Sequence, residues 1–356
     1  MKVLSLSLDS KIIDQEQSVL DRMSRYSEIV DQYILVVADE RKDEVEINDK
    51  VKAFGSGGSN KITKFFHIFF LASKILRENI FDIVTTQNPF FLGLVGSMLK
   101  NRHNVKLELQ FHGWKNSPEW LMKYNLKEAD SIRVVSERIK NRLIDEYEVD
   151  PEIITVVPII VKEEIDETKE NYEASKPFTF LSVQRLVGVK KVELQIEAIE
   201  KLKKQGIDAK LFIAGSGEEE QKLKNLVKEK ELQDKVEFLG WLSKEELNQT
   251  YTKADCYLLT SNSEGWGRTV VEAAGRGLPI IMTDVGCAGE FIEDEQSGLV
   301  IETKNLEELQ AAMEKIVEDK SLREKLGKDA IQSYKNLPDE KEIMDKYLQS
   351  WQKAIN

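Results

Sequence analysis

Strand-like and helix-like segments alternate along almost the whole sequence, and this alternation limits the possible folds more than any other feature. Apolar runs of strand length lie near residues 2–8, 32–38, 81–87, 106–111, 131–136 and 153–157, then near 178–184, 209–214, 235–239, 255–260, 279–283 and 298–302. Helical patterns lie near 15–29, 61–79, 90–101 and 136–148, and amphipathic segments separate the later strands. Such alternation predicts two doubly wound α/β domains, each with a parallel sheet and helices on both faces.

The borders of these domains follow from composition. Residues 166–177 are polar and acidic and lack apolar periodicity, so we expect a linker there, between a first domain at 1–165 and a second at 178–339. Beyond Asn305 the pattern is helical, with expected breaks near Gly327 and Pro338 and a last helix within 340–356. The segment 55–58 (GSGG) is interpreted as a flexible turn.

Composition excludes several classes of protein. With 356 residues, 41% hydrophobic and 32% charged, the chain resembles a soluble globular protein of two domains. A net charge of −12 disfavours nucleic acid as a partner. Two cysteines make no disulfide framework and favour a reducing cytoplasm. The N-terminus does not resemble a signal peptide, and no segment has the roughly 18 apolar residues of a membrane span.

The segment 61–77 (KITKFFHIFFLASKILR) allows two interpretations. Its aromatic residues and four lysine or arginine residues suit a helix lying on an anionic membrane at the inner face, which would make the protein a peripheral one. Alternatively it is a packing helix, with Phe65, Ile68 and Phe69 facing the sheet and lysines at the rim. We favour the packing helix.

The segment 261–277 (SNSEGWGRTVVEAAGRG) carries the most specific chemistry. It follows a predicted strand and contains a glycine-rich turn, with Glu264 before the turn and Glu272 in the helix that follows. A strand, a glycine turn and a helix N-terminus leave backbone N–H groups unpaired, which suits phosphate or a hydroxyl-rich ligand. Gly265 and Gly267 allow a ligand to approach the backbone.

This segment resembles the glutamate–seven–glutamate signature of the retaining family 4 glycosyltransferases. The resemblance extends over residues 178–302, where 180–190 (FLSVQRLVGVK), 211–217 (LFIAGSG) and 236–240 (VEFLG) are similar to donor-domain segments of that family. It implies the GT-B fold, in which two facing Rossmann-like domains enclose a cleft, and it implies that the helix at 340–356 returns to the first domain.

The resemblance also implies catalytic roles. Glu264 would contact the transferred sugar, and Arg185 and Lys190 would stabilise the charge of the leaving diphosphate, a role that the neighbouring Lys191 could also take. The alternative is that Arg185 and Lys190 are surface cations. His112, which precedes a glycine at the end of a strand, would face the sugar from the first domain, or else it is structural.

Further residues would bind the donor. The backbone of Gly265, Trp266, Gly267 and Arg268 would hold sugar hydroxyls or phosphate, with Thr269 at the helix start. Glu272 would bind ribose hydroxyls, although it could also pair with Arg268 along the helix. Gly215 and Gly217 would border the base. In the first domain the glycine-rich loop of the family is absent, and Asp9, Ser10 and Lys11 are the candidates to line the acceptor side.

The resemblance thus implies a retaining hexosyltransferase that uses a nucleotide-diphosphate sugar, a UDP- or GDP-sugar, and a hydroxyl acceptor, such as a growing glycan, a lipid-linked saccharide or a small molecule. No Asp-x-Asp pair, zinc spacing or phosphate-binding P-loop occurs, so we expect no metal and no cofactor. A nucleotide-sugar epimerase of the same fold and a catalytically degenerate sugar-nucleotide-binding protein are the alternatives.

Overall fold

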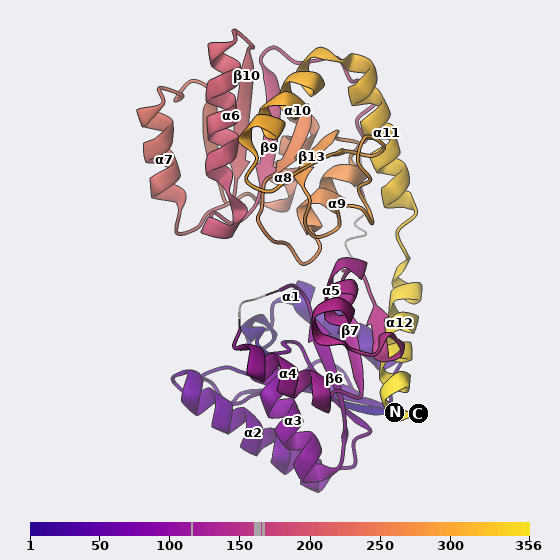
Figure 1. The fold of residues 1–356 in the computed structure, drawn as a ribbon. Helices are drawn as coiled ribbons and strands as arrows, with labels where there is room; N and C mark the ends of the chain where they lie inside the picture. The colour runs from indigo at the N-terminus through magenta and orange to yellow at the C-terminus, as the bar shows by residue number, and fades with distance from the viewer. Residues whose placement is uncertain (115–116, 160–164, 166–167) are drawn as a thin grey trace. The chain divides into compact units, whose positions relative to one another are not determined.

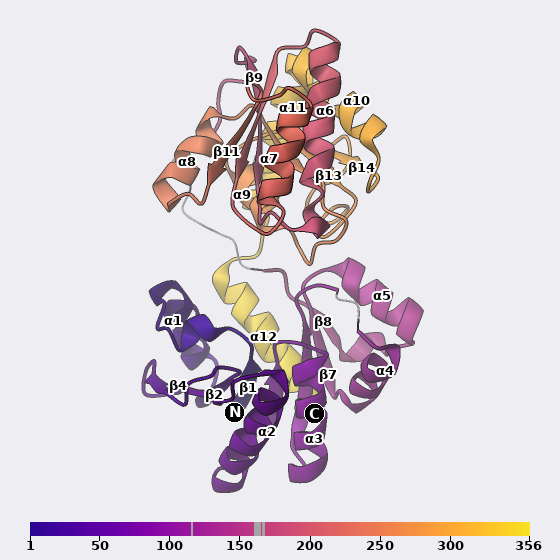
Figure 2. The same cartoon turned by 90° about the vertical axis from the view of Figure 1, so that its left-hand side faces the viewer.

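The computed structural model describes residues 1–114, 117–159, 165 and 168–356. The chain forms two compact units (Figures 1 and 2). The first unit joins Met1–Pro158 to Pro338–Asn356, and the second is Ile159–Leu337. The first part of the chain therefore ends at Pro158, before the border expected at residue 165.

The first unit is built on a sheet in the order β3-β4-β2-β1-β5-β6-β7-β8. The strands are β1 (Lys2–Ser7), β2 (Gln32–Val37), β3 (Glu44–Glu46), β4 (Val51–Gly55), β5 (Ile83–Thr86), β6 (Lys106–Phe111), β7 (Ser131–Val134) and β8 (Ile154–Val156). Every pairing is parallel except β3 with β4, which is antiparallel. Strand order reverses direction at β1, so a ligand is expected near its carboxyl end.

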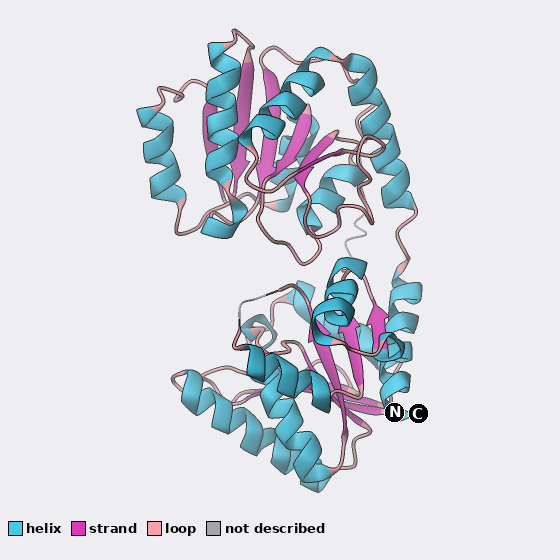
Figure 3. Cartoon of the chain, viewed as in Figure 1, coloured by secondary structure: helices cyan, strands magenta, loops and turns pink. Residues whose placement is uncertain are grey.

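Helices cover this sheet on both sides, as the colouring by secondary structure makes clear (Figure 3). They are α1 (Gln17–Ser24), α2 (Lys61–Glu78), α3 (Phe91–His103), α4 (Glu119–Glu128), α5 (Glu137–Tyr147) and α12 (Glu340–Ile355). The last helix, α12, packs on β6, β7 and β8. Its residues Met344, Trp351 and Ala354 share a core with residues of β1 and β2, which confirms the expected return of the C-terminal helix.

A buried charge fixes α12 to the sheet. Glu108 of β6 has no exposed surface, and its carboxylate accepts hydrogen bonds from Ser350 Oγ and, at 3.1 Å, from Trp351 Nε1. Arg133 Nε lies 3.6 Å from the same carboxylate, and its guanidinium stacks 3.7 Å from the ring centre of Tyr347. A buried carboxylate is tolerated only with such partners, so α12 completes the polar interior of the first unit.

The second unit has a wholly parallel sheet in the order β11-β10-β9-β12-β13-β14. Its strands are β9 (Phe178–Val183), β10 (Ala209–Ala214), β11 (Val236–Gly240), β12 (Cys256–Leu259), β13 (Ile280–Thr283) and β14 (Leu299–Ile301). Its helices are α6 (Val192–Lys204), α7 (Glu220–Glu229), α8 (Lys244–Lys253), α9 (Arg268–Gly275), α10 (Leu306–Glu318) and α11 (Lys320–Lys335). Strand order reverses between β9 and β12.

Two expectations are wrong in detail. The predicted linker at 166–177 is not free where the structure describes it: Tyr172 is buried and its hydroxyl donates to the Gly277 carbonyl at 3.0 Å. The helix α11 continues through Gly327 without a break. The glycine is needed there because a side chain would collide with Tyr172, which packs closely against the helix. The break instead comes at Asp319, which caps α11. Residues 166 and 167 lie outside the described part of the chain.

Two strands and a helix were not predicted. The strands β3 and β4 form a short hairpin that is partly polar, and β4 ends at Gly55, at the start of the predicted turn 55–58. The helix α4 has too weak an apolar period to stand out. In the described residues, no helix is both long enough and apolar enough to cross a membrane.

Candidate functional site

The most elaborate polar site of the second unit lies where β9 and β12 end side by side. This is the point at which strand order reverses, and in open α/β sheets ligands bind beyond the carboxyl ends of the strands at such a point. The loop after β9 carries Arg185 and Lys190, and the loop after β12 carries Ser261 and Glu264. Parallel topology therefore brings together residues that are more than seventy positions apart.

Hydrogen bonds hold these two loops against each other. The hydroxyl of Thr260 donates to the carbonyls of Lys190 and Lys191, at 3.2 and 3.0 Å. The backbone N–H of Asn262 donates to the Val189 carbonyl at 2.8 Å. Buried Gln195, from α6, donates to Thr260 Oγ1 at 2.9 Å. The loops are thus placed by the body of the unit before any ligand binds.

Lys190 and Glu264 form an ion pair at the centre of the site. Lys190 Nζ lies 2.5 Å from Glu264 Oε1, and the two side chains are only 15% and 12% exposed. Ser261, which is fully buried, donates from Oγ to the same carboxylate oxygen at 2.6 Å. One oxygen of Glu264 therefore receives two donors, and this arrangement fixes the carboxylate at the mouth of the turn.

The turn beside this pair offers unpaired backbone donors. The N–H groups of Gly265, Trp266 and Gly267 make no hydrogen bond to any residue that the structure describes. Gly267 has φ +104°, a conformation that favours glycine, and it immediately precedes α9. Donors at a helix start, next to a lysine, form a concentrated positive field that attracts an anion.

A glycine on the neighbouring loop makes this turn possible. A side chain at Gly286 would place its Cβ 2.4 Å from the Trp266 carbonyl oxygen and 2.8 Å from Glu264 Cβ. The Cys287 N–H also donates to the Trp266 carbonyl at 2.8 Å. The backbone of residues 286 and 287 therefore packs directly against the turn. Only glycine at position 286 permits so close an approach.

The Trp266 side chain lies in the interior of the second unit. It is 4% exposed and packs near Phe291, so this residue offers only its backbone to a ligand. Thr269 is also engaged, because its Oγ1 accepts a 2.5 Å hydrogen bond from the buried Tyr257 hydroxyl. Its side chain supports the start of α9 rather than presenting a free hydroxyl.

Glu272 lies one turn further along α9 and is only partly buried. Its Oε2 accepts a hydrogen bond of 3.1 Å from the hydroxyl of Tyr251, a buried residue of α8. Burial, and then the charge of Glu272, raise the pKa of Tyr251 well above its ordinary value, so the phenol remains a donor. The carboxylate is thus oriented by a residue of the neighbouring helix.

The remaining cations differ in their partners. Arg185 is exposed, and no hydrogen bond or ion pair of its side chain occurs among the described residues. Lys191 instead pairs with Glu193 at 3.1 Å, so it is not a ready substitute for Lys190. Arg268, at the first turn of α9, is exposed. Arg185 and Arg268 are therefore the cations that an anion could reach without breaking an ion pair.

Gly215 and Gly217 serve the fold directly. A Cβ at Gly215 would lie 2.0 Å from the Gln184 carbonyl oxygen, and one at Gly217 would lie 2.3 Å from that of Leu186. These glycines let the loop after β10 pack against the loop after β9, which carries Arg185. Their predicted place beside a base stays a prediction.

In the first unit, His112 directly follows β6. Its Nε2 lies 3.2 Å from Gln110 Oε1. The pKa of His112 is lowered, mainly because neighbouring atoms displace water from around the imidazole, and also because Arg133 and Arg22 are positively charged. The residue still has surface in contact with water, so the pKa is lowered less than that of a fully buried imidazole. The neutral imidazole is therefore the prevailing form at pH 7.

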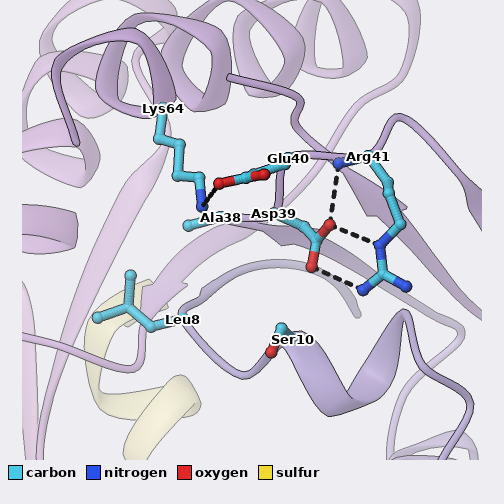
Figure 4. Close-up of a pocket in the computed structure, with 7 residues that line it drawn as sticks. All are labelled: Leu8, Ser10, Ala38, Asp39, Glu40, Arg41 and Lys64. Carbon is cyan, nitrogen blue, oxygen red and sulfur yellow. Dashed lines mark hydrogen bonds and ion pairs between the residues drawn. The ribbon is translucent and has the colours of Figure 1, made fainter. Parts of the chain in front are cut away.

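A polar pocket of about 490 Å³ lies at the carboxyl ends of β1 and β2 (Figure 4). Its lining residues are Leu8, Ser10, Ala38, Asp39, Glu40, Arg41 and Lys64. Arg41 donates to both oxygens of Asp39, at 2.8 and 2.9 Å, and these hydrogen bonds lower the pKa of Asp39 to about 2. Lys64 faces Glu40 at 3.8 Å. Charges in the pocket are balanced, which suits a neutral, hydroxyl-rich ligand.

The three predicted acceptor-side residues do not behave alike. Ser10 lines the pocket, whereas Asp9 is paired with Arg22 at 3.1 Å and Lys11 with Glu16 at 2.8 Å. The charged residues that follow β2 were not predicted from the sequence. The rule that ligands bind beyond the carboxyl ends of strands could have identified Asp39 and Arg41.

Within residues 1–114, 117–159, 165 and 168–356, no group of three or more His, Cys, Asp or Glu side chains is arranged to hold a metal ion.

Two protein-family models match the chain. Residues 163–333 match the model described as glycosyl transferases group 1, and residues 30–164 match the model of glycosyltransferase family 4. An uncharacterized glycosyltransferase of Methanocaldococcus jannaschii is 29% identical over 301 residues, which are 83% of this chain and 78% of that protein. The GtfA subunit of a UDP-N-acetylglucosamine–peptide N-acetylglucosaminyltransferase from Streptococcus pneumoniae is 31% identical, but the match spans only 36% of that protein and 50% of this chain.

Solved structures show the same architecture. Sucrose-phosphate synthase from Thermosynechococcus elongatus superposes with a TM-score of 0.80 at 18% identity, covering 99% of this chain and 98% of that one. Anabaena HepE in complex with UDP gives 0.76 at 17% identity, covering 99% and 100%. The protein is therefore a glycosyltransferase with the GT-B fold. The two family matches together support the family 4 type.

Proposed function

We propose that this enzyme is a retaining transferase that moves a hexose from a nucleoside-diphosphate sugar to a hydroxyl acceptor. The observation that carries this proposal is the Lys190–Glu264 pair beside three unpaired N–H groups at the β9/β12 crevice. The cation and the backbone N–H groups suit a diphosphate, and the carboxylate suits the hydroxyl groups of a sugar. That HepE was solved with UDP supports the nucleotide part.

The donor occupies the second unit in this proposal. Its diphosphate accepts from the N–H groups of Gly265, Trp266 and Gly267 and from Lys190 and Arg185. Glu264, released from Lys190 by the phosphate, accepts from hydroxyls of the transferred sugar. Glu272, oriented by Tyr251, accepts from the ribose. Each group thus meets the part of the donor that matches its charge.

The chemistry is a substitution at the anomeric carbon. The bond between that carbon and the phosphate oxygen breaks, and its electron pair leaves with the nucleoside diphosphate. The acceptor hydroxyl attacks from the same face, and its proton passes to the departing phosphate oxygen. Lys190 and Arg185 stabilise the charge that grows on the leaving group. Because the acceptor bonds on the face that the phosphate leaves, the sugar keeps its anomeric configuration, and no enzyme nucleophile is required.

The acceptor binds the first unit in this proposal. The pocket of Ser10, Asp39, Glu40, Arg41 and Lys64 presents donors and acceptors to hydroxyls at the carboxyl ends of β1 and β2. Fixed carboxylate–guanidinium pairs of this kind accept and donate without reorganising. His112, uncharged at neutral pH, is the further candidate to contact the sugar.

A donor screen tests the proposal. Thermal unfolding is measured with UDP-, GDP- and ADP-sugars, because a ligand that binds the native state raises the apparent stability. The donor that stabilises is then incubated with saccharide acceptors, and the anomeric configuration of the product is read by NMR. Inversion of configuration contradicts the retaining mechanism. A stabilising donor that is epimerised in the absence of any acceptor would instead identify an epimerase.

A further inference from the structure

Helix α2 of the first unit presents two apolar faces, although a packing helix needs only one. Ile68, Phe69 and Ala72 are buried against the unit, as the packing interpretation predicts. A second row, made of Ile62, Phe66 and Phe70, is 71%, 50% and 63% exposed. Residues spaced four apart lie on one side of a helix, so these three form a continuous stripe. Half or more of each of these three side chains is therefore open to solvent.

Cations continue the same stripe. Lys74 and Arg77 lie four and seven positions after Phe70, which places them on the side of α2 that carries the exposed aromatic rings. Lys74 reaches Glu78 only at 3.9 Å, and Arg77 makes no ion pair with the described residues. No aspartate or glutamate occurs in residues 61–77. In a chain of net charge −12, this is a locally positive surface.

The neighbouring helix extends this positive surface. Figures 1 and 2 both show α3 beside α2, and the two helices pack together through contacts that include Ser73 and His103. The α3 segment Phe91–His103 has Lys100 and Arg102 and no acidic residue. Arg102 has no ion pair among the described residues, whereas Lys100 pairs with Asp130 at 2.8 Å.

We propose that the α2 face formed by Ile62, Phe66, Phe70, Lys74 and Arg77 binds the surface of an anionic lipid membrane. Apolar side chains enter the boundary between headgroups and acyl chains, while lysine and arginine meet the lipid charge, and both are present here on one side of a helix. A second copy of this chain fits the face poorly. A symmetric contact would offer Lys74 and Arg77 no acidic partner from the same helix face, because residues 61–77 contain no aspartate or glutamate.

Vesicle sedimentation with the full-length protein tests the proposal. We expect the protein to sediment with vesicles that contain phosphatidylglycerol, and to sediment much less with pure phosphatidylcholine. Raising the salt concentration should release it, because screening weakens the attraction between the cations and the lipid. Failure to bind the anionic vesicles at low salt overturns the proposal.

Two double variants separate the apolar and the charged contributions. Phe66→Ser with Phe70→Ser should lower the vesicle partition coefficient by about 10-fold or more, because buried aromatic area is lost. Lys74→Gln with Arg77→Gln should lower it on the order of 5-fold for each charge removed. Because all four side chains are on the surface, the thermal unfolding of both variants should match that of the wild type.

Matched controls come from the second unit. Trp241→Ser removes an aromatic side chain that is 81% exposed, and Lys201→Gln with Lys204→Gln removes two cations with the same spacing on α6. Both controls should bind vesicles as the wild type does. If they weaken binding as much as the α2 variants do, α2 is not the membrane-binding face. If the wild type is a dimer in light scattering and Phe66→Ser with Phe70→Ser makes it monomeric, the face joins two subunits and the proposal is wrong.

Discussion

At the scale of single residues, Glu264 is the partner of Lys190, the cation to which the proposed mechanism assigns the donor diphosphate. Its carboxylate receives Lys190 at 2.5 Å and Ser261 at 2.6 Å, so in the free protein the lysine is neutralised by a neighbour. In the proposed mechanism, the donor phosphate therefore replaces Glu264 as the anion beside Lys190. This exchange keeps the charge around Lys190 balanced both with and without the donor. Glu264 takes part in the exchange and Glu272 does not, so we expect substitutions of these two residues to have different effects.

Glu264→Gln should nearly abolish transfer while free nucleoside diphosphate still binds, because the change frees Lys190 and removes a group at the reacting centre. Glu272→Gln should weaken binding of nucleotide sugar and free nucleotide alike by roughly 1–3 kcal/mol, the usual cost of an unpaired partner. Calorimetry with the free nucleotide is compared with transfer rates at saturating donor. Equal effects of both variants on both measurements would show that these roles are wrongly divided.

Lys190→Ala and Arg185→Ala should each lower turnover more than donor affinity, because the leaving-group charge is greatest in the transition state. The loss should be on the order of 10²-fold or more for each variant. Lys191→Ala is the matched control, since Lys191 is paired with Glu193 at 3.1 Å, and its turnover should be near that of the wild type. Normal turnover of both Lys190→Ala and Arg185→Ala would identify them as surface cations.

The sequence predicted those residues of the site that follow strands directly. Arg185, Lys190 and Glu264 come after apolar runs, and the parallel topology places such positions at one edge of the sheet. Ser261 and Tyr251 were missed, because their contribution is a contact to a carboxylate and leaves no pattern in sequence. The roles of Gly286 and Gly217 as close-packing positions depend on backbone of other loops, which only the folded structure shows.

At the scale of elements, the buried parallel strands were predictable because each is a short apolar run between turn residues. The hairpin of β3 and β4 escaped prediction because β3 has a single buried residue, Val45. Conversely, Gly327 was taken for a helix break, although its missing side chain is needed where Tyr172 crosses α11. Such local signals fail where a partner that is distant in sequence determines the outcome.

The helix α12 gives a prediction for stability. Trp351→Ala should lower the free energy of unfolding of the first unit by about 3–5 kcal/mol, because a fully buried ring is lost and Glu108 loses a hydrogen-bond donor. Hydrogen exchange measures the stability of each unit separately. Amides of β1 and β2 should lose protection, while amides of β9 should keep theirs. Trp241→Ala, at an exposed site, should change neither unit by more than about 0.5 kcal/mol. An equal loss in β9 would contradict the assignment of α12 to the first unit alone.

At the scale of the whole molecule, we predict that transfer does not need a divalent metal. Lys190 and Arg185 can neutralise the diphosphate in the proposed mechanism, and the unpaired N–H groups of the turn add to their field. Transfer rates should therefore be unchanged in excess EDTA. Complete loss of activity that magnesium or manganese restores would sink this prediction.

The return of α12 to the first unit sets the order in which the molecule can be completed during synthesis. The strands β1 to β8 leave the ribosome first, but Trp351 and Ser350, which pair with the buried Glu108, are added after the entire second unit. Until then the carboxylate of Glu108 lacks two of its partners, and the core around Tyr26 and Tyr33 is uncovered. The second unit is continuous in sequence and can fold as soon as it emerges. The half of the protein that is translated first is therefore finished last.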